Sequence, residues 1–95
     1  MSTVVVYAYI VRKPRICGGL PHIKGTRIRV MDVVALHKRG RSPAEILDSF
    51  EHLSLAQVHS ALAYYYDHED EIEREFAEAQ RSVEKFKAKH PGMTR

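Results

Sequence analysis

The residues best suited to chemistry in this sequence are two arginines in the string IKGTRIRV, where Gly25 separates two short arms of alternating apolar residues. This pattern predicts a tight hairpin or a close backbone turn, because glycine adopts conformations that strain other residues. Alternation places Arg27 and Arg29 side by side on one face of the second arm. There they would contact phosphate groups. The alternative is that both arginines are solvated or paired with carboxylates of the same chain.

The charges of the chain are divided unevenly between its two parts. Residues 1–41 hold nine Lys or Arg and one acid, Asp32, which gives +8, whereas residues 42–95 hold six basic and eleven acidic side chains, which gives −5. Such asymmetry indicates an anionic partner such as double-stranded DNA. The alternative is self-neutralisation, in which the basic part pairs with the acidic run from Asp67 to Glu78 inside a monomer or a dimer.

Metal and enzyme chemistry find little support in the sequence. Cys17, the single cysteine, has no evident base beside it that would make it a nucleophile, and no phosphate-binding or dinucleotide-binding glycine motif is present. The acids Glu69, Asp70 and Glu71 are expected to lie in the first turn of a helix, where their negative charges interact favourably with the helix dipole. We therefore expect a protein that is not an enzyme and needs no cofactor or metal. The histidines offer no pair of metal ligands at i, i+4, and they are His22, His37, His52, His59, His68 and His90.

The length of 95 residues and the hydrophobic content of 44% predict one domain over residues 1–95 with one core. One cysteine excludes an intrachain disulfide and fits a reducing cytoplasm. The first residues show neither a signal peptide nor the roughly 20 apolar residues of a membrane span. We therefore expect a cytoplasmic protein.

Residues 1–30 are expected to form a β-strand followed by the hairpin region. The segment from Thr3 to Val11 is rich in β-branched and aromatic residues, as in a strand. Its only evident partner within the chain is the short segment around residues 27–30. We therefore expect this strand to meet another chain, through Tyr7 and Tyr9, or to be covered by the helices.

Residues 31–67 are expected to form a three-helix core. The first helix is predicted from Val30 or Met31 to Arg39, because apolar residues recur at helical spacing and Gly40 supplies a stop.

A second, short helix is predicted from its capping residues. Ser42 precedes Pro43 and Glu45, which is the pattern of an N-cap, a proline in the first turn and a capping-box acid. We expect this helix to end near Ser49 or Phe50.

The third helix is predicted over Leu55–Asp67 after a cap at Ser54. Two short helices with a break of about three or four residues match helix-turn-helix geometry, with this helix in the recognition position. It holds no Lys or Arg before Asp67, so Lys24, Arg27, Arg29 and Lys38 would have to hold the DNA phosphates. Three side chains would approach the bases, namely Gln57, His59 and Ser60.

The third helix is also expected to have a buried stripe, which consists of Leu55, Val58, Leu62 and Tyr65. Because consecutive residues point in different directions around a helix, at least one of Tyr64, Tyr65 and Tyr66 must lie at the surface.

The longest helix, which falls in residues 68–90, is predicted from Glu69 to about Lys89. A helix of about 20 residues is roughly 30 Å long, more than this core can cover, so part of it should pack on a second subunit or another protein. The alternative is that it folds back over its own three helices. Its apolar residues repeat at steps of four and three, like the seam of a coiled coil, and they are Ile72, Phe76, Ala79, Val83 and Phe86.

Several strings together resemble a known family. They are ICGG followed by Pro21, the string GTRI, a Gly-x-Ser pair before the second helix, and a leucine and serine that open the third. The stretch from about Pro14 to Glu71 resembles the family called domain of unknown function 433. The resemblance implies a homeodomain-like helix-turn-helix fold. It also implies the role of a VapB-like antitoxin of a type II toxin–antitoxin pair, whose partner is a toxin with a PIN-like ribonuclease fold.

The chain departs from the family pattern at two positions. Arg29 and Glu51 stand where the family often has proline, and Glu51 would weaken a phosphate contact if its turn lay near DNA.

The sequence thus predicts a mainly α, homeodomain-like helix-turn-helix bundle with a short N-terminal strand or hairpin and a long C-terminal helix. We expect a dimeric antitoxin that binds a PIN-like toxin and represses its own operon by binding DNA. The alternative is a homodimeric protein-interaction module without DNA binding. In both cases the interface residues would include Tyr7, Tyr9, Ile72, Phe76, Val83 and Phe86.

Overall fold

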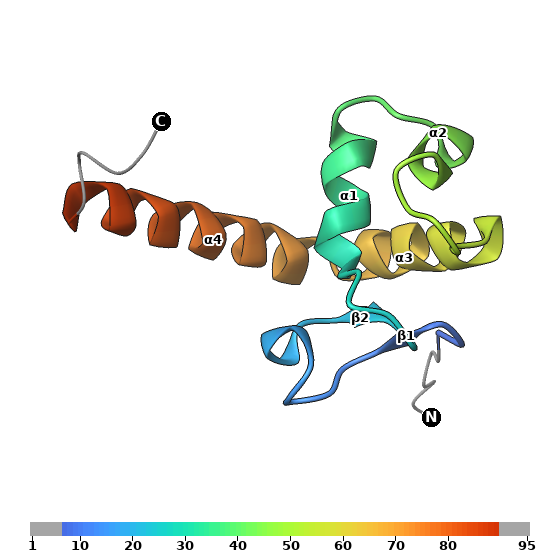
Figure 1. The fold of residues 1–95 in the computed structure, drawn as a ribbon, viewed down its shortest axis with the longest axis horizontal. Coiled ribbons are helices and arrows are strands. Elements are labelled where there is room, and N and C mark those ends of the chain that lie inside the picture. The colour runs from blue at the N-terminus through green and yellow to red at the C-terminus, as the bar shows by residue number, and fades with distance from the viewer. Residues whose placement is uncertain (1–6, 90–95) are drawn as a thin grey trace.

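The computed structural model describes residues 7–89 of the chain. It confirms a mainly helical fold with a short N-terminal hairpin and a long C-terminal helix (Figure 1). Three helices form a body above the hairpin, and the fourth projects away from it (Figure 1). In chain order the elements are β1 (Ile10–Val11), a 3₁₀ turn η1 (Cys17–Gly19), β2 (His22–Ile23), α1 (Val30–Lys38), α2 (Pro43–Leu47), α3 (Leu55–Asp67) and α4 (Glu69–Lys89).

The hairpin region is built around β2. On one side β1 pairs with it in antiparallel register, with Ile10 opposite Ile23. On the other side the Ile23 N–H donates to the Ile28 carbonyl at 2.9 Å, and His22 forms a bridge with Arg29. Gly25, with φ +80°, makes the predicted tight turn between these two arms.

The predicted N-terminal strand is confirmed at Ile10–Val11 and is wrong for residues 7–9. Residues 8–9 form a turn in which the Ile10 N–H donates to the Tyr7 carbonyl at 3.1 Å, and only Ile10–Val11 is extended. The chain turns there because the Tyr7 ring packs on α3 instead of continuing along a sheet. The partner of β1 is β2, not the segment 27–30 that the sequence suggested. Residues 3–6 of that prediction lie outside the described residues.

The helix boundaries follow local capping. The Ser42 hydroxyl accepts the Glu45 N–H at 3.2 Å, and the Glu45 carboxylate accepts the Ser42 N–H at 2.8 Å. Gly40, with φ +85°, follows the end of α1 as predicted. Helix α2 ends at Leu47, earlier than expected, because the next residues form tighter i→i−3 hydrogen bonds, such as Ser49 N–H to the Ile46 carbonyl at 3.0 Å.

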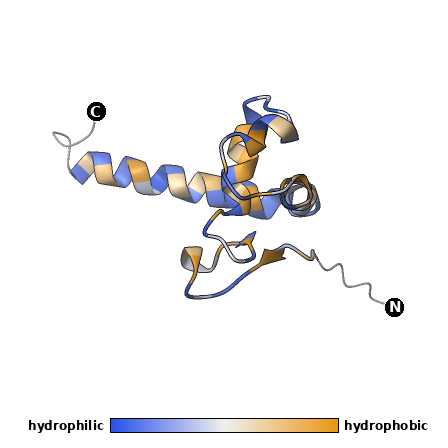
Figure 2. Cartoon of the chain, turned by 45° about the vertical axis from the view of Figure 1, so that its right-hand side comes forward, coloured by the Kyte–Doolittle hydropathy of each residue, from blue (hydrophilic) through white to orange (hydrophobic). Residues whose placement is uncertain are grey.

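The core lies where the hairpin, the first three helices and the first turns of α4 meet, and there the ribbon is mostly hydrophobic (Figure 2). The predicted stripe of α3 is correct for Val58, Leu62 and Tyr65 but wrong for Leu55, which is 46% exposed. Leu55 is the first residue of α3 and lies beyond the core, whereas Ala61 is buried and completes the stripe.

Helix α4 projects away from the body formed by the other helices (Figure 1). Every residue from 77 to 89 is exposed. The radius of gyration is 15.0 Å, against about 12 Å for a compact domain of this length. The alternative that α4 folds back over its own helices therefore holds only for its first turns. Among residues 7–89, no helix combines the length and apolar character that crossing a bilayer requires.

Candidate functional site

Two cations of the front part are neutralised by α4, as the self-neutralisation alternative predicts. Arg12 forms an ion pair with Glu71, lies 3.7 Å from Glu75, and donates to the Gly19 carbonyl at 3.1 Å. At the C-terminal end of α1, Lys38 Nζ lies 2.6 Å from the Glu73 carboxylate. These pairs fix the start of α4 to the hairpin and to α1, and they remove Lys38 from the cations expected to be available for DNA.

Arg29 and Arg27 have different environments. The Arg29 guanidinium donates to both carboxylate oxygens of Asp32, at 2.7 and 3.1 Å, and this hydrogen bonding raises the pKa of Arg29. Asp32 also accepts the Arg29 N–H at 2.9 Å, which caps α1. Arg29 is therefore held by its own chain, whereas Arg27 is exposed. The expected pair of available guanidinium groups is reduced to one.

Four exposed cations of the hairpin region form what we call the basic hairpin surface, and they are Lys13, Arg15, Lys24 and Arg27. Within residues 7–89, none of the four forms an ion pair with a carboxylate. Lys24 and Arg27 were predicted as phosphate ligands. Lys13 and Arg15 were not singled out, although the string RKPR that contains them was a visible signal.

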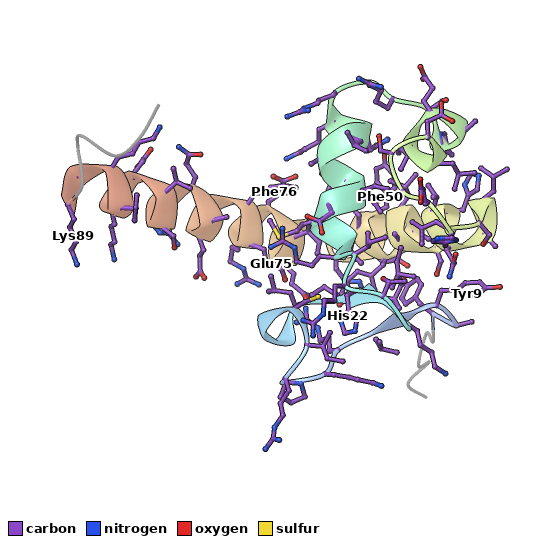
Figure 3. The ribbon with its side chains drawn as sticks, viewed as in Figure 1. Tyr9, His22, Phe50, Glu75, Phe76 and Lys89 are labelled. Atoms are coloured by element: carbon purple, nitrogen blue, oxygen red, sulfur yellow. The ribbon has the colours of Figure 1, made fainter. Side chains whose placement is uncertain are left out.

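A cleft of about 400 Å³ opens in this surface. One wall comes from the chain before η1 and the other from the Gly25 turn, and the lining residues are Lys13, Ile16, His22, Gly25, Thr26 and Arg27. His22 is only 1% exposed, and its Nδ1 lies 3.1 Å from the Leu20 carbonyl. Figure 3 shows the His22 ring between the hairpin and the base of α1. The cleft is thus a polar site with a buried imidazole at its inner side.

The residues expected to approach DNA bases lie on α3, apart from the basic hairpin surface. The Gln57 side chain accepts the Ser54 N–H at 2.7 Å and so belongs to the cap of α3. His59 is exposed and Ser60 is half-buried. The exposed acids of the preceding turn are Asp48 and Glu51. The structure therefore does not gather the seven predicted DNA-contacting residues into one surface.

The three consecutive tyrosines of α3 each make a different contact. Tyr64 stacks on His68 with ring centroids 4.1 Å apart, Tyr65 donates to Glu73 at 2.6 Å, and the Tyr66 hydroxyl lies 2.6 Å from His37 Nε2. Tyr66 is the exposed member, so the prediction that at least one lies at the surface is confirmed. The bond to Glu73 raises the pKa of Tyr65 to about 12.

The two predicted interface residues of the N-terminal segment lie differently. The Tyr7 hydroxyl donates to Asp67, which raises the pKa of Tyr7 to about 12, and the Tyr7 ring meets Tyr64 edge-on. Tyr7 therefore attaches the N-terminal segment to α3 of its own chain. Tyr9 is 41% exposed and points away from the body in Figure 3.

The apolar seam of α4 is divided between the body and solvent. Ile72 is fully buried, and Phe76 is half-buried with Lys38 Nζ 4.6 Å from its ring centroid. The outer part of the seam, which we call the α4 ridge, consists of Ala79, Val83 and Phe86. Val83 and Phe86 are each 47% exposed. Of the predicted α4 interface residues, the inner ones thus pack on the body, whereas Val83 and Phe86 are exposed.

Glu75, which the sequence did not single out, lies in the angle between α4 and the body (Figure 3). One of its carboxylate oxygens is buried and has no hydrogen-bond partner among the described residues, and burial raises the pKa of Glu75 despite the nearby Arg12. It lines a small cavity of about 170 Å³ together with Leu20, Met31 and Ala79. Within residues 7–89 no group of His, Cys, Asp and Glu side chains is arranged to hold a metal ion.

These features define a small, mainly helical domain that carries a basic hairpin and a projecting helix. The family model described as protein of unknown function (DUF433) matches residues 10–65, so the chain belongs to the DUF433 family. The crystal structure of a DUF433 member protein from Anabaena variabilis ATCC 29413 is similar, with a TM-score of 0.68 and 33% sequence identity. The match covers 73% of this chain and 68% of that chain. No curated protein matches the chain.

Proposed function

We propose that the protein is the antitoxin of a type II toxin–antitoxin pair and that α4 binds and inhibits a toxin of the PIN-like ribonuclease type. The observation that carries this proposal is the exposed outer part of α4, residues 77–89, with the α4 ridge along it. The apolar ridge residues recur at i, i+4 and i+7, which is the spacing of helices that dock into a groove of another protein.

The ends of α4 suit this role. Its first turns are anchored by Ile72 in the core and by the ion pair between Lys38 and Glu73, so the outer part starts from a fixed base. An ordered helix loses less conformational entropy on binding than a disordered tail does. The last turns carry Lys85, Lys87 and Lys89, which would complement an acidic toxin surface and increase the association rate.

The test is co-purification with the product of the neighbouring gene, together with a ribonuclease assay. We expect wild type to form a stable complex and to suppress RNA cleavage. Val83→Glu should abolish both, because it places a charge in the apolar contact. Ala88→Glu is the matched control, because it adds the same charge on the opposite side of the same turns. Equal inhibition by both variants, or no complex with wild type, contradicts the proposal.

The alternative partner for the α4 ridge is a second copy of this chain. The mass of the isolated protein distinguishes the two. A homodimer that Val83→Glu converts to monomer, with no binding to the neighbouring gene product, favours a homodimeric interaction module over an antitoxin.

The basic hairpin surface supports a second candidate function, which is binding of double-stranded DNA to repress the operon. Its four cations have no carboxylate partner among residues 7–89, and phosphate neutralisation supplies most of the affinity for DNA. The four contacts would give a slope of log affinity against log salt of up to about −3.6. Promoter binding that does not change with salt, or no binding at low salt, contradicts this candidate.

A further inference from the structure

We propose that the cleft in the basic hairpin surface is a binding site for a phosphate group, either free or carried by a nucleic-acid backbone. The proposal goes beyond the protein-binding role of α4 and does not depend on it. It deepens the DNA candidate only if the phosphate belongs to a duplex.

The charges around the cleft favour an anion. Lys13 and Arg27 line it from opposite segments, and none of the six described lining residues is a carboxylate. The other cations near the hairpin are satisfied by the chain itself, since Arg12 pairs with Glu71 and Arg29 with Asp32. The chain therefore neutralises its hairpin cations selectively and leaves those of the cleft available. An arginine fork and a lysine ammonium are both common phosphate ligands.

The backbone of the Gly25 turn adds hydrogen-bond donors at the same place. Neither the Gly25 N–H nor the Arg27 N–H donates to an acceptor within residues 7–89. Backbone N–H groups of a turn that includes a left-handed residue often converge on an anion, and Gly25 has φ +80°. The Thr26 hydroxyl is already engaged, because it donates to the Ile23 carbonyl at 2.8 Å and accepts the Ile28 N–H at 3.0 Å.

The walls of the cleft are held in place before any ligand binds. The inner side is β2, whose backbone is bonded to β1 on one side and to Ile28 on the other. The two walls are joined by the Cys17 thiol, which lies 3.4 Å from the Arg27 carbonyl. Cys17 has a φ of 53°, which strains a residue other than glycine, so the surrounding contacts must hold this turn in place. A preformed site avoids the entropic cost of assembling its donors on binding.

The experiment titrates the full chain with inorganic phosphate at constant ionic strength and follows backbone amide shifts by NMR. We expect saturable shifts of the Gly25 and Arg27 amides. The double variant of Lys13→Gln and Arg27→Gln should lose at least tenfold in affinity, because both charged donors are removed. The control is the double variant of Arg39→Gln and Arg41→Gln, which removes two exposed cations beyond the far end of α1 and should bind as wild type does.

A second titration uses a short DNA duplex and separates the two sources of phosphate. Saturation by inorganic phosphate indicates a free phosphate or phosphate ester. Shifts of the same amides by duplex, without saturation by inorganic phosphate, indicate a backbone phosphate. Both results support the site if the cleft variant abolishes them. Absence of saturable shifts with either probe, or equal loss in the cleft variant and the control, overturns the proposal. Val83→Glu should leave both titrations unchanged, so this result is independent of the toxin test.

Discussion

Replacing Ile72 and Val83 by alanine, each alone, tests how the seam of α4 is divided between the body and solvent. The two residues belong to the same apolar repeat, but Ile72 is fully buried and Val83 is 47% exposed. A buried Ile to Ala change costs about 2–5 kcal/mol, because it removes apolar contacts and leaves a cavity. At about 3 kcal/mol, the melting temperature of a domain of this size falls by about 12–24 °C.

Val83→Ala should change stability by no more than about 0.5 kcal/mol. Its small loss of apolar contact is offset by the higher helix propensity of alanine, which is worth up to about 0.5 kcal/mol relative to valine. The melting temperature should therefore stay within about 4 °C of wild type. Differential scanning calorimetry of dilute samples measures both variants, and circular dichroism checks that α4 remains helical.

One result would refute the division of the seam. If Val83→Ala lowered the melting temperature as much as Ile72→Ala does, the outer part of α4 would be covered in the free protein. A melting temperature that rises with protein concentration would identify the cover as a second copy, because association stabilises the folded state by mass action.

Three further predictions concern hydrogen bonds and buried charge. Ultraviolet titration should show that Tyr7 and Tyr65 ionise near pH 12, because hydrogen bonds to Asp67 and Glu73 raise their pKa values to about 12. Because these folded pKa values exceed the unfolded value of about 10, the stabilisation from both hydrogen bonds is present below pH 10 and is lost as the pH rises toward 12. Ionisation of Tyr7 and Tyr65 near pH 10 would contradict this prediction. Ser54→Ala should cost about 1 kcal/mol in urea unfolding, because it removes the bond from the Gln57 N–H, whereas Ser49→Ala should be near neutral. Burial raises the pKa of Glu75, so the folded state disfavours its charge, and Glu75→Gln should be more stable than wild type at pH 7. That gain should vanish below about pH 4, where both side chains are neutral, and a gain independent of pH would be evidence against the buried charge.

Features set by local interactions could be predicted from the sequence. The caps at Ser42 and Ser54 depend on partners three residues away, so their hydrogen bonds follow from spacing alone. The start of α4 at Glu69 likewise follows from the acids of its first turn, which interact favourably with the helix dipole. The resemblance carried by ICGG and GTRI is confirmed at the level of the family.

Features set by tertiary contacts could not be predicted. Alternation placed Arg27 and Arg29 together, but Arg29 is held by Asp32 because α1 begins there and its first turn brings the carboxylate close. The burial of Glu75 depends on how α4 crosses the body. The cleft was missed because its walls are two segments that only the fold brings together, so Lys13 had no visible relation to the Gly25 turn.

The break between α3 and α4 sets the direction in which α4 leaves the body. His68, with φ −136° and ψ 40°, is the single residue between the two helices, and the contacts that steady α4 lie within its first turns. Helix α4 is roughly 30 Å long, so a change of about 10° in its direction would displace its last turn by roughly 5 Å. Such a change would also require repacking of Ile72 and of the ion pairs that Glu71 and Glu73 form, so the position of the exposed tip is tied to the packing of the body.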